Sequence, residues 1–171
     1  DFGEESNLLA IDKEAFSGCN IQEISFPASL QTIGEGAFFS NYSLSKVEFE
    51  EGSNLTSIGA EAFSYTISLG SITFPEKLKT IGDHAFSVSA LREVYIPDTV
   101  TALSDSALAV SGPTTAYIPA SVVEIASQYE YVSYCSLTRD VALLTIVTTS
   151  GSYAEEYANK YGIKCVIVEE W

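Results

Sequence analysis

The chain has 171 residues, of which 46% are hydrophobic, and its 23 acidic and 8 basic side chains give a formal net charge of −15. This apolar content is typical of a globular domain and excludes an intrinsically disordered chain. A surface this acidic repels phosphate groups, which disfavours nucleic acids and anionic membrane surfaces as partners. No stretch approaches the ~20 consecutive apolar residues that span a bilayer, so we expect no membrane insertion.

One sequence pattern occurs six times between residues 8 and 125. Each copy opens with two apolar residues three positions apart, and most copies continue with Ala-Phe and later with an apolar residue followed by proline. The second apolar residues of these pairs lie 22 to 25 positions apart and are Ile11, Ile33, Ile58, Ile81, Leu103 and Ile125. A fixed period in the twenties indicates a leucine-rich-repeat solenoid, an architecture that builds extended surfaces.

The copy at residues 69–86 shows how one repeat is expected to fold. Ile72 and Phe74 alternate with polar residues, as in a strand with one buried face, and Pro75 ends this strand because it has no N–H to donate. Residues 83–86 are expected to form a single helical turn that places a phenylalanine in the core. Equivalent helical turns are predicted at residues 35–38 and 60–63. One repeat cannot bury its apolar side chains alone, so the copies must stack around a shared core.

Stacked copies run in the same direction, so their strands should form a parallel sheet. The predicted strands are residues 23–26, 46–49, 71–74, 93–96 and 115–118. Between their buried positions these strands carry two rows of solvent-facing residues. The first row is Glu23, Lys46, Ser71, Glu93 and Thr115, and the second row is Ser25, Glu48, Thr73, Tyr95 and Tyr117.

The second row places two aromatic side chains, Tyr95 and Tyr117, on neighbouring strands. Neighbouring strands are ~4.8 Å apart, so the two rings should lie side by side in solvent. Exposed aromatic side chains are enriched at recognition sites, and Glu93 and Thr115 flank this pair with polar groups. The sequence therefore predicts a contact surface for a partner at Glu93, Tyr95, Thr115 and Tyr117. The alternative is that the pair only supports the sheet, as cross-strand aromatic residues do.

Both ends of the repeat array depart from the pattern. The start, residues 2–8, matches residues 49–55 in spacing, which indicates a chain that begins in mid-repeat. We therefore expect the natural protein to continue upstream or to have lost an N-terminal portion. After Ile125 the Ala-Phe pattern fails, and residues 126–142 are interpreted as a divergent last coil. The repeat array is assigned to residues 1–142.

Residues 143–171 are predicted to form a C-terminal cap packed on the array. Its elements in chain order are a strand at 142–147, a helix at 153–161 and a strand at 163–168. Ser152 caps the helix and Gly162 ends it, and its inner stripe is Ala154, Tyr157, Ala158 and Tyr161. The predicted fold class is α/β: a right-handed leucine-rich-repeat solenoid with a parallel strand ladder, short single-turn helices and a C-terminal strand–helix–strand cap.

The best-preserved repeat resembles the BspA-type leucine-rich repeat. Its matching residues are Ile81-Gly82-x-x-Ala85-Phe86 followed by Leu91-x-x-Val94-x-Ile96-Pro97-x-x-Val100-x-x-Leu103. The run from Gly151 to Ala158 is similar to the tail that often closes such arrays. The resemblance implies a bacterial protein that is surface-exposed or secreted and is sometimes linked to adhesion to host proteins or to other cells. It implies no catalytic residues.

No catalytic, metal or cofactor site is recognisable in the residues themselves. His84 is the one histidine, and it lies at a variable position that is predicted to be exposed. A triad or a histidine-based metal site would need partners for it, and none is recognisable. The acidic pairs Glu50-Glu51 and Glu155-Glu156 are explained by a surface turn and by the first turn of the helix, where acidic side chains favour the dipole. We expect no enzyme activity and no cofactor.

The three cysteines, Cys19, Cys135 and Cys165, are an odd number without the spacing of a disulfide framework. Cys19 follows an Ala-Phe element and is predicted to be a core thiol. Cys165 lies in an apolar run and is also predicted to be buried. A bridge between Cys135 and Cys165 is left open.

Two classes of function remain. The first is a non-enzymatic extracellular binding or adhesion module that presents its sheet face to a protein or glycan partner. The second is a structural spacer that holds another domain of a longer surface protein. The chain is expected to be monomeric or to associate through its open N-terminal edge, and the family resemblance implies a location outside the cell or on its surface.

Overall fold

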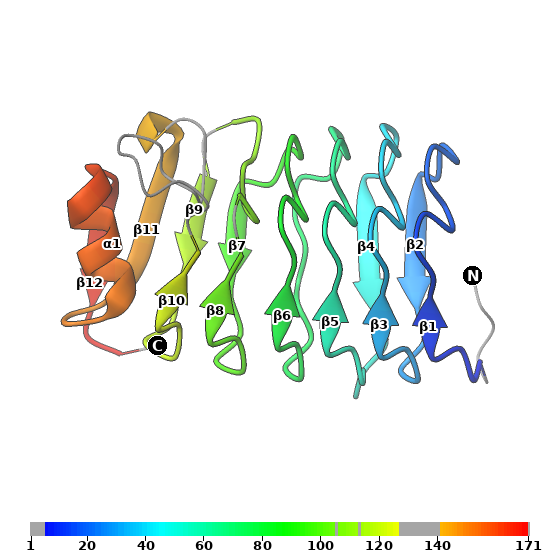
Figure 1. Cartoon of the computed structure of the whole chain (residues 1–171), viewed down its shortest axis with the longest axis horizontal. Coiled ribbons are helices and arrows are strands. Elements are labelled where there is room, and N and C mark those ends of the chain that lie inside the picture. Colours follow the sequence, from blue (N-terminus) through cyan, green and yellow to red (C-terminus); the bar gives the residue numbers. More distant parts are fainter. Residues whose placement is uncertain (1–5, 105, 113, 127–140, 171) are drawn as a thin grey trace.

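The computed structural model describes residues 6–104, 106–112, 114–126 and 141–170. The chain winds into coils that stack side by side along the long axis of the molecule, and the α-helix α1 (Tyr153–Tyr161) lies at the C-terminal end (Figure 1). Each of the first five coils combines a short strand, a turn segment and a longer strand or extended segment. They are coil one (residues 10–26), coil two (32–49), coil three (57–74), coil four (80–95) and coil five (102–117).

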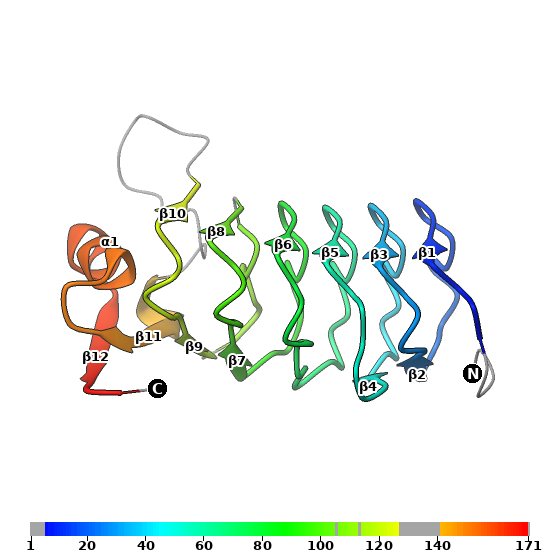
Figure 2. The same ribbon diagram turned by 90° about the horizontal axis from the view of Figure 1, so that it is seen from below.

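Two parallel ladders run along different sides of the coils (Figure 2). Two-residue strands form the first ladder, in which β1 (Ala10–Ile11), β3 (Thr32–Ile33), β5 (Ser57–Ile58) and β6 (Thr80–Ile81) make one sheet, and β8 (Ala102–Leu103) and β10 (Glu124–Ile125) make another. Longer strands form the second ladder. Its first sheet is β2 (Glu23–Phe26) with β4 (Lys46–Phe49), and its second is β7 (Glu93–Tyr95), β9 (Thr114–Tyr117), β11 (Leu144–Thr149) and β12 (Lys164–Val168).

Four of the five predicted long strands are confirmed, and their register is the predicted one. Glu23 pairs with Lys46 on one side of the break, and Tyr95 pairs with Tyr117 on the other. The fifth prediction, a strand at 71–74, is wrong, because this segment makes only an isolated bridge from Ser71 to Glu93.

The break in the long-strand ladder follows the longest repeat, which has two additional residues between β4 and Leu55. They lie in a turn closed by a hydrogen bond from Ser53 N to Glu50 O at 3.1 Å. The turn bonds back to coil one, through Glu50 N to Phe26 O at 3.0 Å and Asn54 N to Ala28 O at 2.9 Å. Strand β4 is therefore held against β2, and its other edge is left without a paired strand among the described residues.

The segments predicted as single helical turns are runs of hydrogen-bonded turns instead. In coil two, Ala37 N donates to Gly34 O and Phe39 N to Gly36 O, whereas the N–H groups that alternate with these donate to coil three. Gly36 N bonds to Ala60 O, and Phe38 N bonds to Ala62 O, both at 2.8 Å. A helix would direct every N–H along its own axis, so these turns link the coils in a way that a helix cannot.

A column of phenylalanine rings fills the middle of the array. Phe38, Phe63 and Phe86 are fully buried, and their rings stack with centroids 5.2 and 5.3 Å apart and interplanar angles of 6° and 4°. Phe16 in coil one continues the column at 5.4 Å from Phe38. Phe38 and Phe63 therefore each contact rings of the coils before and after them, which ties the cores of the first four coils together.

Three predicted burial states need correction. Cys19 is exposed rather than buried in the core, because it lies in coil one, whose outer side no described coil covers. Cys165 is half-buried on β12 at the edge of its sheet, where desolvation is the first cause that raises the pKa of its thiol. His84 is half-buried rather than exposed. Cys135, and with it the bridge left open to Cys165, lies outside the described residues.

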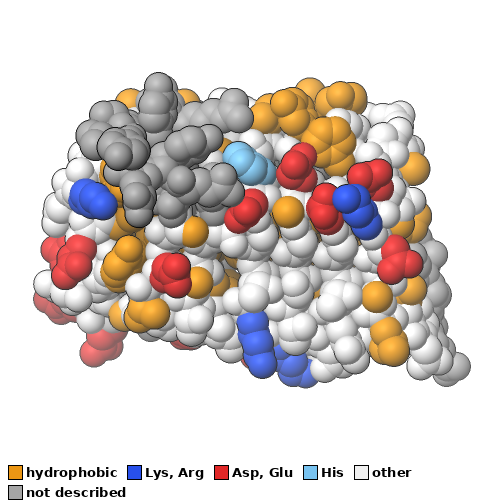
Figure 3. Space-filling model, in the orientation of Figure 1, with side chains coloured by type: hydrophobic (Ala, Val, Ile, Leu, Met, Phe, Trp, Pro, Cys, Tyr) orange, Lys and Arg blue, Asp and Glu red, His pale blue; other side chains and the backbone are white. Residues whose placement is uncertain are grey.

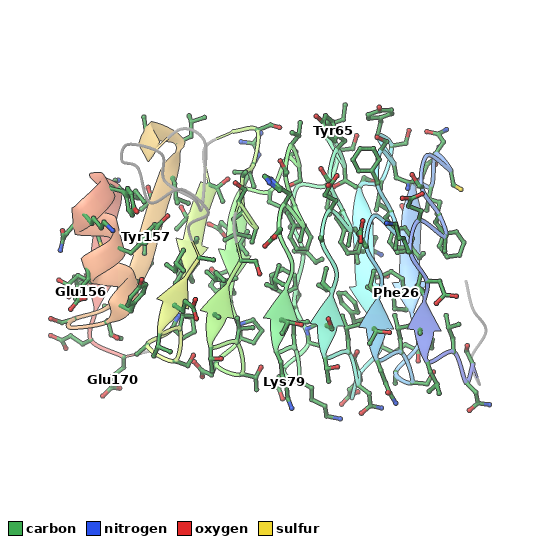
Figure 4. The ribbon with its side chains drawn as sticks, in the orientation of Figure 1. Phe26, Tyr65, Lys79, Glu156, Tyr157 and Glu170 are labelled. Carbon is green, nitrogen blue, oxygen red and sulfur yellow. The ribbon has the colours of Figure 1, made fainter. Side chains whose placement is uncertain are left out.

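The C-terminal elements follow the prediction closely. After a short 3₁₀ helix, η1 (Val141–Leu143), the chain forms β11, α1 (Tyr153–Tyr161) and β12. Ser152 Oγ accepts a hydrogen bond from Glu155 N at 3.1 Å, and Gly162 ends the helix with φ 68°. The buried stripe of α1 consists of Ala154, Tyr157 and Ala158 (Figure 4 labels Tyr157).

These elements do more than cover the last coil, because β11 pairs with β9 and β12 pairs with β11. The cap therefore extends the long-strand sheet by two strands. Ile167 is 44% exposed on β12, the edge strand of this sheet. Within the described part of the chain, no helix has the length and apolar character needed to cross a membrane.

Glycines at one repeat position allow the coils to approach each other closely. A Cβ added to Gly82 would lie 2.5 Å from Ala60 N, and one added to Gly59 would lie 2.7 Å from Glu35 N. We expect Gly82→Ala to destabilise the fold by about 1–3 kcal/mol, because the backbones must move apart. Gly70→Ala is the control: its Cβ would meet nothing within 4 Å, so stability should be unchanged or slightly higher. Denaturant melts with equal midpoints for the two variants would contradict this account.

Candidate binding surface

The structure brings together the four residues predicted to form a contact surface. Glu93 pairs with Thr115, and Tyr95 pairs with Tyr117, on the neighbouring strands β7 and β9. The two tyrosine rings stack with centroids 4.1 Å apart and an interplanar angle of 8°. Tyr95 is 54% exposed, whereas Tyr117 is half-buried between its neighbours. One face of the Tyr95 ring contacts Tyr117, and the ring remains largely in solvent.

The row that contains Tyr95 and Tyr117 continues across the cap strands. Val147 on β11 lies beside Tyr117, and Val166 on β12 lies beside Val147. Val147 is buried and Val166 is 39% exposed, so the exposed apolar side chains of this row are at its two ends. The sequence of residues 144–149 is that of a strand, but its register against the repeats could not be predicted, because residues 126–142 do not follow the repeat pattern.

An open groove of about 940 Å³ lies on the side of Tyr95 that faces away from Tyr117. Its walls are the unpaired edge of β4 with the turn after it, and the segment from Ser71 to Lys77. The bridge between Ser71 and Glu93 places Thr73 in line with Tyr95 along the outer face. The segment from Ser71 to Lys77 therefore lies between the groove and the tyrosine pair, so the two features are neighbours on the same face. The repeat pattern contains no signal for this groove, because the groove exists only where the predicted strand at 71–74 fails to pair.

Charged side chains of both signs surround this groove. Lys46 forms an ion pair with Glu48 at 2.9 Å, and hydrogen bonding to Glu48 is the first cause that raises the pKa of Lys46. Lys77 donates a hydrogen bond to Asn54 Oδ1 at 2.7 Å. Both lysines thus contact acceptors of the protein, and glutamates 50, 51 and 76 add negative charge to the lining.

This arrangement can stack against a ring or planar group and can hydrogen-bond polar groups beside it. Among the described residues, no group of three or more His, Cys, Asp or Glu side chains could hold a metal ion. The surface is broad and shallow, so it is suited to an extended partner.

The pKa of the Tyr95 hydroxyl depends on its contact with Tyr117. Its pKa is raised above the ordinary value, first by a hydrogen bond with the Tyr117 side chain and then by desolvation. Because the folded-state pKa is raised, this group contributes stability below pH ~10 that is lost as the pH rises through the folded-state value. We expect Tyr117→Phe to lower the pKa of Tyr95, as measured by NMR titration of labelled tyrosine Cζ. An unchanged titration would contradict the hydrogen bond.

Stacked coils, two parallel ladders and a broad outer face define a solenoid repeat protein that offers a surface instead of an enclosed pocket. The chain belongs to the BspA-type leucine-rich repeat family, because residues 9–138 match the profile described as the BspA type leucine rich repeat region, in 6 copies. The resemblance drawn from the repeat at residues 81–103 is thereby confirmed.

Solved bacterial structures share this fold. A leucine-rich repeat protein of T. pallidum is 20% identical, with a TM-score of 0.62 over 98% of this chain and 83% of its own, and this similarity shows the fold alone. A leucine-rich cell surface protein of Faecalibacterium prausnitzii is 25% identical, with a TM-score of 0.54 over 82% of this chain and 42% of its own.

A leucine-rich repeat protein of Bacteroides ovatus is 27% identical, with a TM-score of 0.51 over 82% of this chain and 41% of its own. The matched part of the chain thus corresponds to about two fifths of each of these last two proteins. No curated protein matches the chain.

Proposed function

We propose that this chain is a non-enzymatic, extracellular binding module that presents the face of its long-strand sheet to a protein or glycan. The observation that carries the proposal is the stacked pair of Tyr95 and Tyr117, which keeps an aromatic ring more than half in solvent on β7, the edge strand of its sheet. An exposed aromatic ring gains little from the core, and such rings are enriched where proteins recognise partners.

Two neighbouring features support the same face as the contact surface. Val166 on β12 is 39% exposed and lies in the same outward row as Tyr117, so it adds apolar area at the far edge of the sheet, although Val147 between them is buried. The groove next to Tyr95 adds carboxylates, lysines and hydroxyls that can hydrogen-bond a polar partner. Glu93 and Thr115 lie beside the tyrosines in the adjacent outward row.

An extracellular location fits the family and its relatives. The similar protein of Faecalibacterium prausnitzii is described as a cell surface protein, and we extend that location to this chain. A second candidate function, a spacer segment of a longer surface protein, is favoured by the two relatives that are more than twice as long as the part matched here. A spacer would not need the exposed tyrosine pair.

The test measures binding of the full chain to a panel of extracellular-matrix proteins and glycans. Replacing Tyr95 and Tyr117 together with serine should weaken binding to the selected partner at least about tenfold, the loss of one good contact. Tyr153→Ser is the matched control, since Tyr153 is also exposed but lies on α1. A large loss of thermal stability in the double variant, with binding intact, would assign the pair to sheet support. The absence of any partner would favour the spacer.

A further inference from the structure

A second exposed apolar patch lies along the turn edge of coils two and three, away from the long-strand sheet. Its members are Phe39, Tyr42, Tyr65 and Ile67, and we name them the turn-edge patch. Tyr42 is 53% exposed, Tyr65 is 42% exposed and Ile67 is 52% exposed. Phe39 is half-buried and meets Tyr65 edge to face, with ring centroids 5.4 Å apart. Figure 3 shows hydrophobic side chains gathered along this edge, and Figure 4 labels Tyr65 there.

The backbone at Tyr65 is strained, and the fold does not require a large side chain there. Gly18, Ser40, Tyr65 and Val88 occupy one repeat position, since each donates its N–H to the next coil through an equivalent bond. All four have positive φ, from 57° to 65°. Glycine adopts this conformation without strain, whereas tyrosine and especially β-branched valine do not.

Packing in the core does not explain why a tyrosine occupies this position. Tyr65 projects into solvent, so burial does not compensate for its left-handed backbone. The left-handed backbone recurs at this position in four coils and belongs to the repeat, which forms it with glycine or serine as well as with tyrosine. The exposed aromatic ring, which the repeat does not need here, therefore points to this edge as a contact surface.

An acidic hollow next to the patch indicates the chemistry of the partner. The hollow has a volume of about 340 Å³ and is lined by Phe39, Gly36 and three glutamates, which are Glu14, Glu35 and Glu61. Gly36 carries no side chain between Glu14 and Glu61, its counterparts in the adjacent coils. The hollow therefore combines carboxylates with one aromatic wall, a setting in which a cationic side chain is favoured.

The negative charge of the hollow affects the pKa of a neighbouring lysine, Lys13. Lys13 forms an ion pair with Glu35 at 2.8 Å. Its pKa is raised, first by the hydrogen bond with Glu35 and also by the charges of Glu14 and Glu61. Three carboxylates face one ammonium group, so the hollow keeps an excess of negative charge.

We propose that the turn-edge patch docks a basic segment of a protein partner. Apolar side chains of the segment rest on Tyr42, Tyr65 and Ile67, and an arginine or lysine enters the acidic hollow beside Phe39. A second copy of this chain is a poor occupant, because each copy carries a net charge of −15 and the two would repel. This surface is separate from the sheet face and does not depend on it.

The test uses the full chain and a fluorescently labelled peptide that combines arginine, leucine and serine. Two further peptides have either the leucines or the arginines replaced by serine. The complete peptide should bind at least about tenfold more tightly than either of them, because it gains from both the patch and the hollow. Equal binding by the peptide without leucines would show attraction to net charge alone and would overturn the proposal.

Variants of the chain locate the binding. Tyr42→Ser with Ile67→Ser should reduce peptide affinity at least about tenfold, and so should Glu14→Gln with Glu61→Gln. Tyr65→Gly should also lose affinity while its melting temperature stays unchanged or rises, since Gly18 occupies the same position in coil one. The sheet-face variant, Tyr95→Ser with Tyr117→Ser, is the control and should bind the peptide normally.

Three results would overturn the proposal. They are unchanged affinity in the Tyr42 and Ile67 double variant, an equal loss in the sheet-face variant, and a clear drop in the melting temperature of Tyr65→Gly. The last result would assign Tyr65 to the stability of the fold. Because the sheet face is intact in all turn-edge variants, failure here leaves the proposed function of that face unaffected.

Discussion

Replacing Phe63 with alanine is expected to lower the free energy of unfolding by about 3–5 kcal/mol, the usual range for emptying a buried aromatic site. Phe63 is fully buried at the centre of the phenylalanine column and stacks on Phe38 and Phe86. The cavity would therefore remove contacts in three coils at once, and collapse of the neighbouring backbones is opposed by the hydrogen bonds between their turns. Denaturant melts of the full chain measure this loss.

Phe16→Ala is the matched control for this prediction. Phe16 occupies the same repeat position in coil one, where it stacks on Phe38 but is only half-buried. Its removal should cost clearly less than the removal of Phe63, because less apolar surface leaves the core. Similar losses of unfolding free energy for Phe63→Ala and Phe16→Ala would contradict the structure, in which Phe63 is the more deeply buried of the two.

Deletion of residues 144–171 is expected to abolish cooperative unfolding or to cause aggregation. The deletion removes β11, so the edge of β9 would present unpaired N–H and C=O groups together with exposed apolar residues. It also removes α1, whose buried residues Ala154, Tyr157 and Ala158 cover the end of the core. Terminal repeats without a cap are prone to association.

Size-exclusion chromatography and thermal melts of the shortened chain test this expectation. The control is Ile167→Ser in the full chain, which should leave both measurements unchanged because Ile167 is largely exposed. A shortened chain that stays monomeric and melts as sharply as the full chain would contradict the role assigned to the cap.

Much of the fold could be predicted because the repeats report their register directly. Residues such as Ile33, Ile58 and Ile81 recur at fixed positions, and matching positions in stacked coils must lie side by side. The same spacing predicts that Tyr95 lies beside Tyr117, as the structure shows. The α1 helix was predictable for a local reason, since Ser152 and Gly162 mark its two ends.

The remaining features depend on backbone geometry that the residue pattern does not express. The segments around Phe38 and Phe63 were expected to be helical, but left-handed residues at positions such as Glu61 direct alternate N–H groups to the next coil. The groove was missed because a repeat of unusual length altered the pairing of 71–74. Cys19 has the sequence context of a buried residue, and only its location in the first coil exposes it.

The two ladders are interrupted at different places, and this has a mechanical consequence. The long-strand ladder stops between coils two and three, where β3 and β5 are paired on the other side. The short-strand ladder stops between β6 and β8, where β7 and β9 are paired. Every junction between described coils is thus crossed by at least one ladder, so the array has no hinge. A force applied at one end is therefore distributed along the array, and the sheet face around Tyr95 stays at a fixed distance from the turn-edge patch.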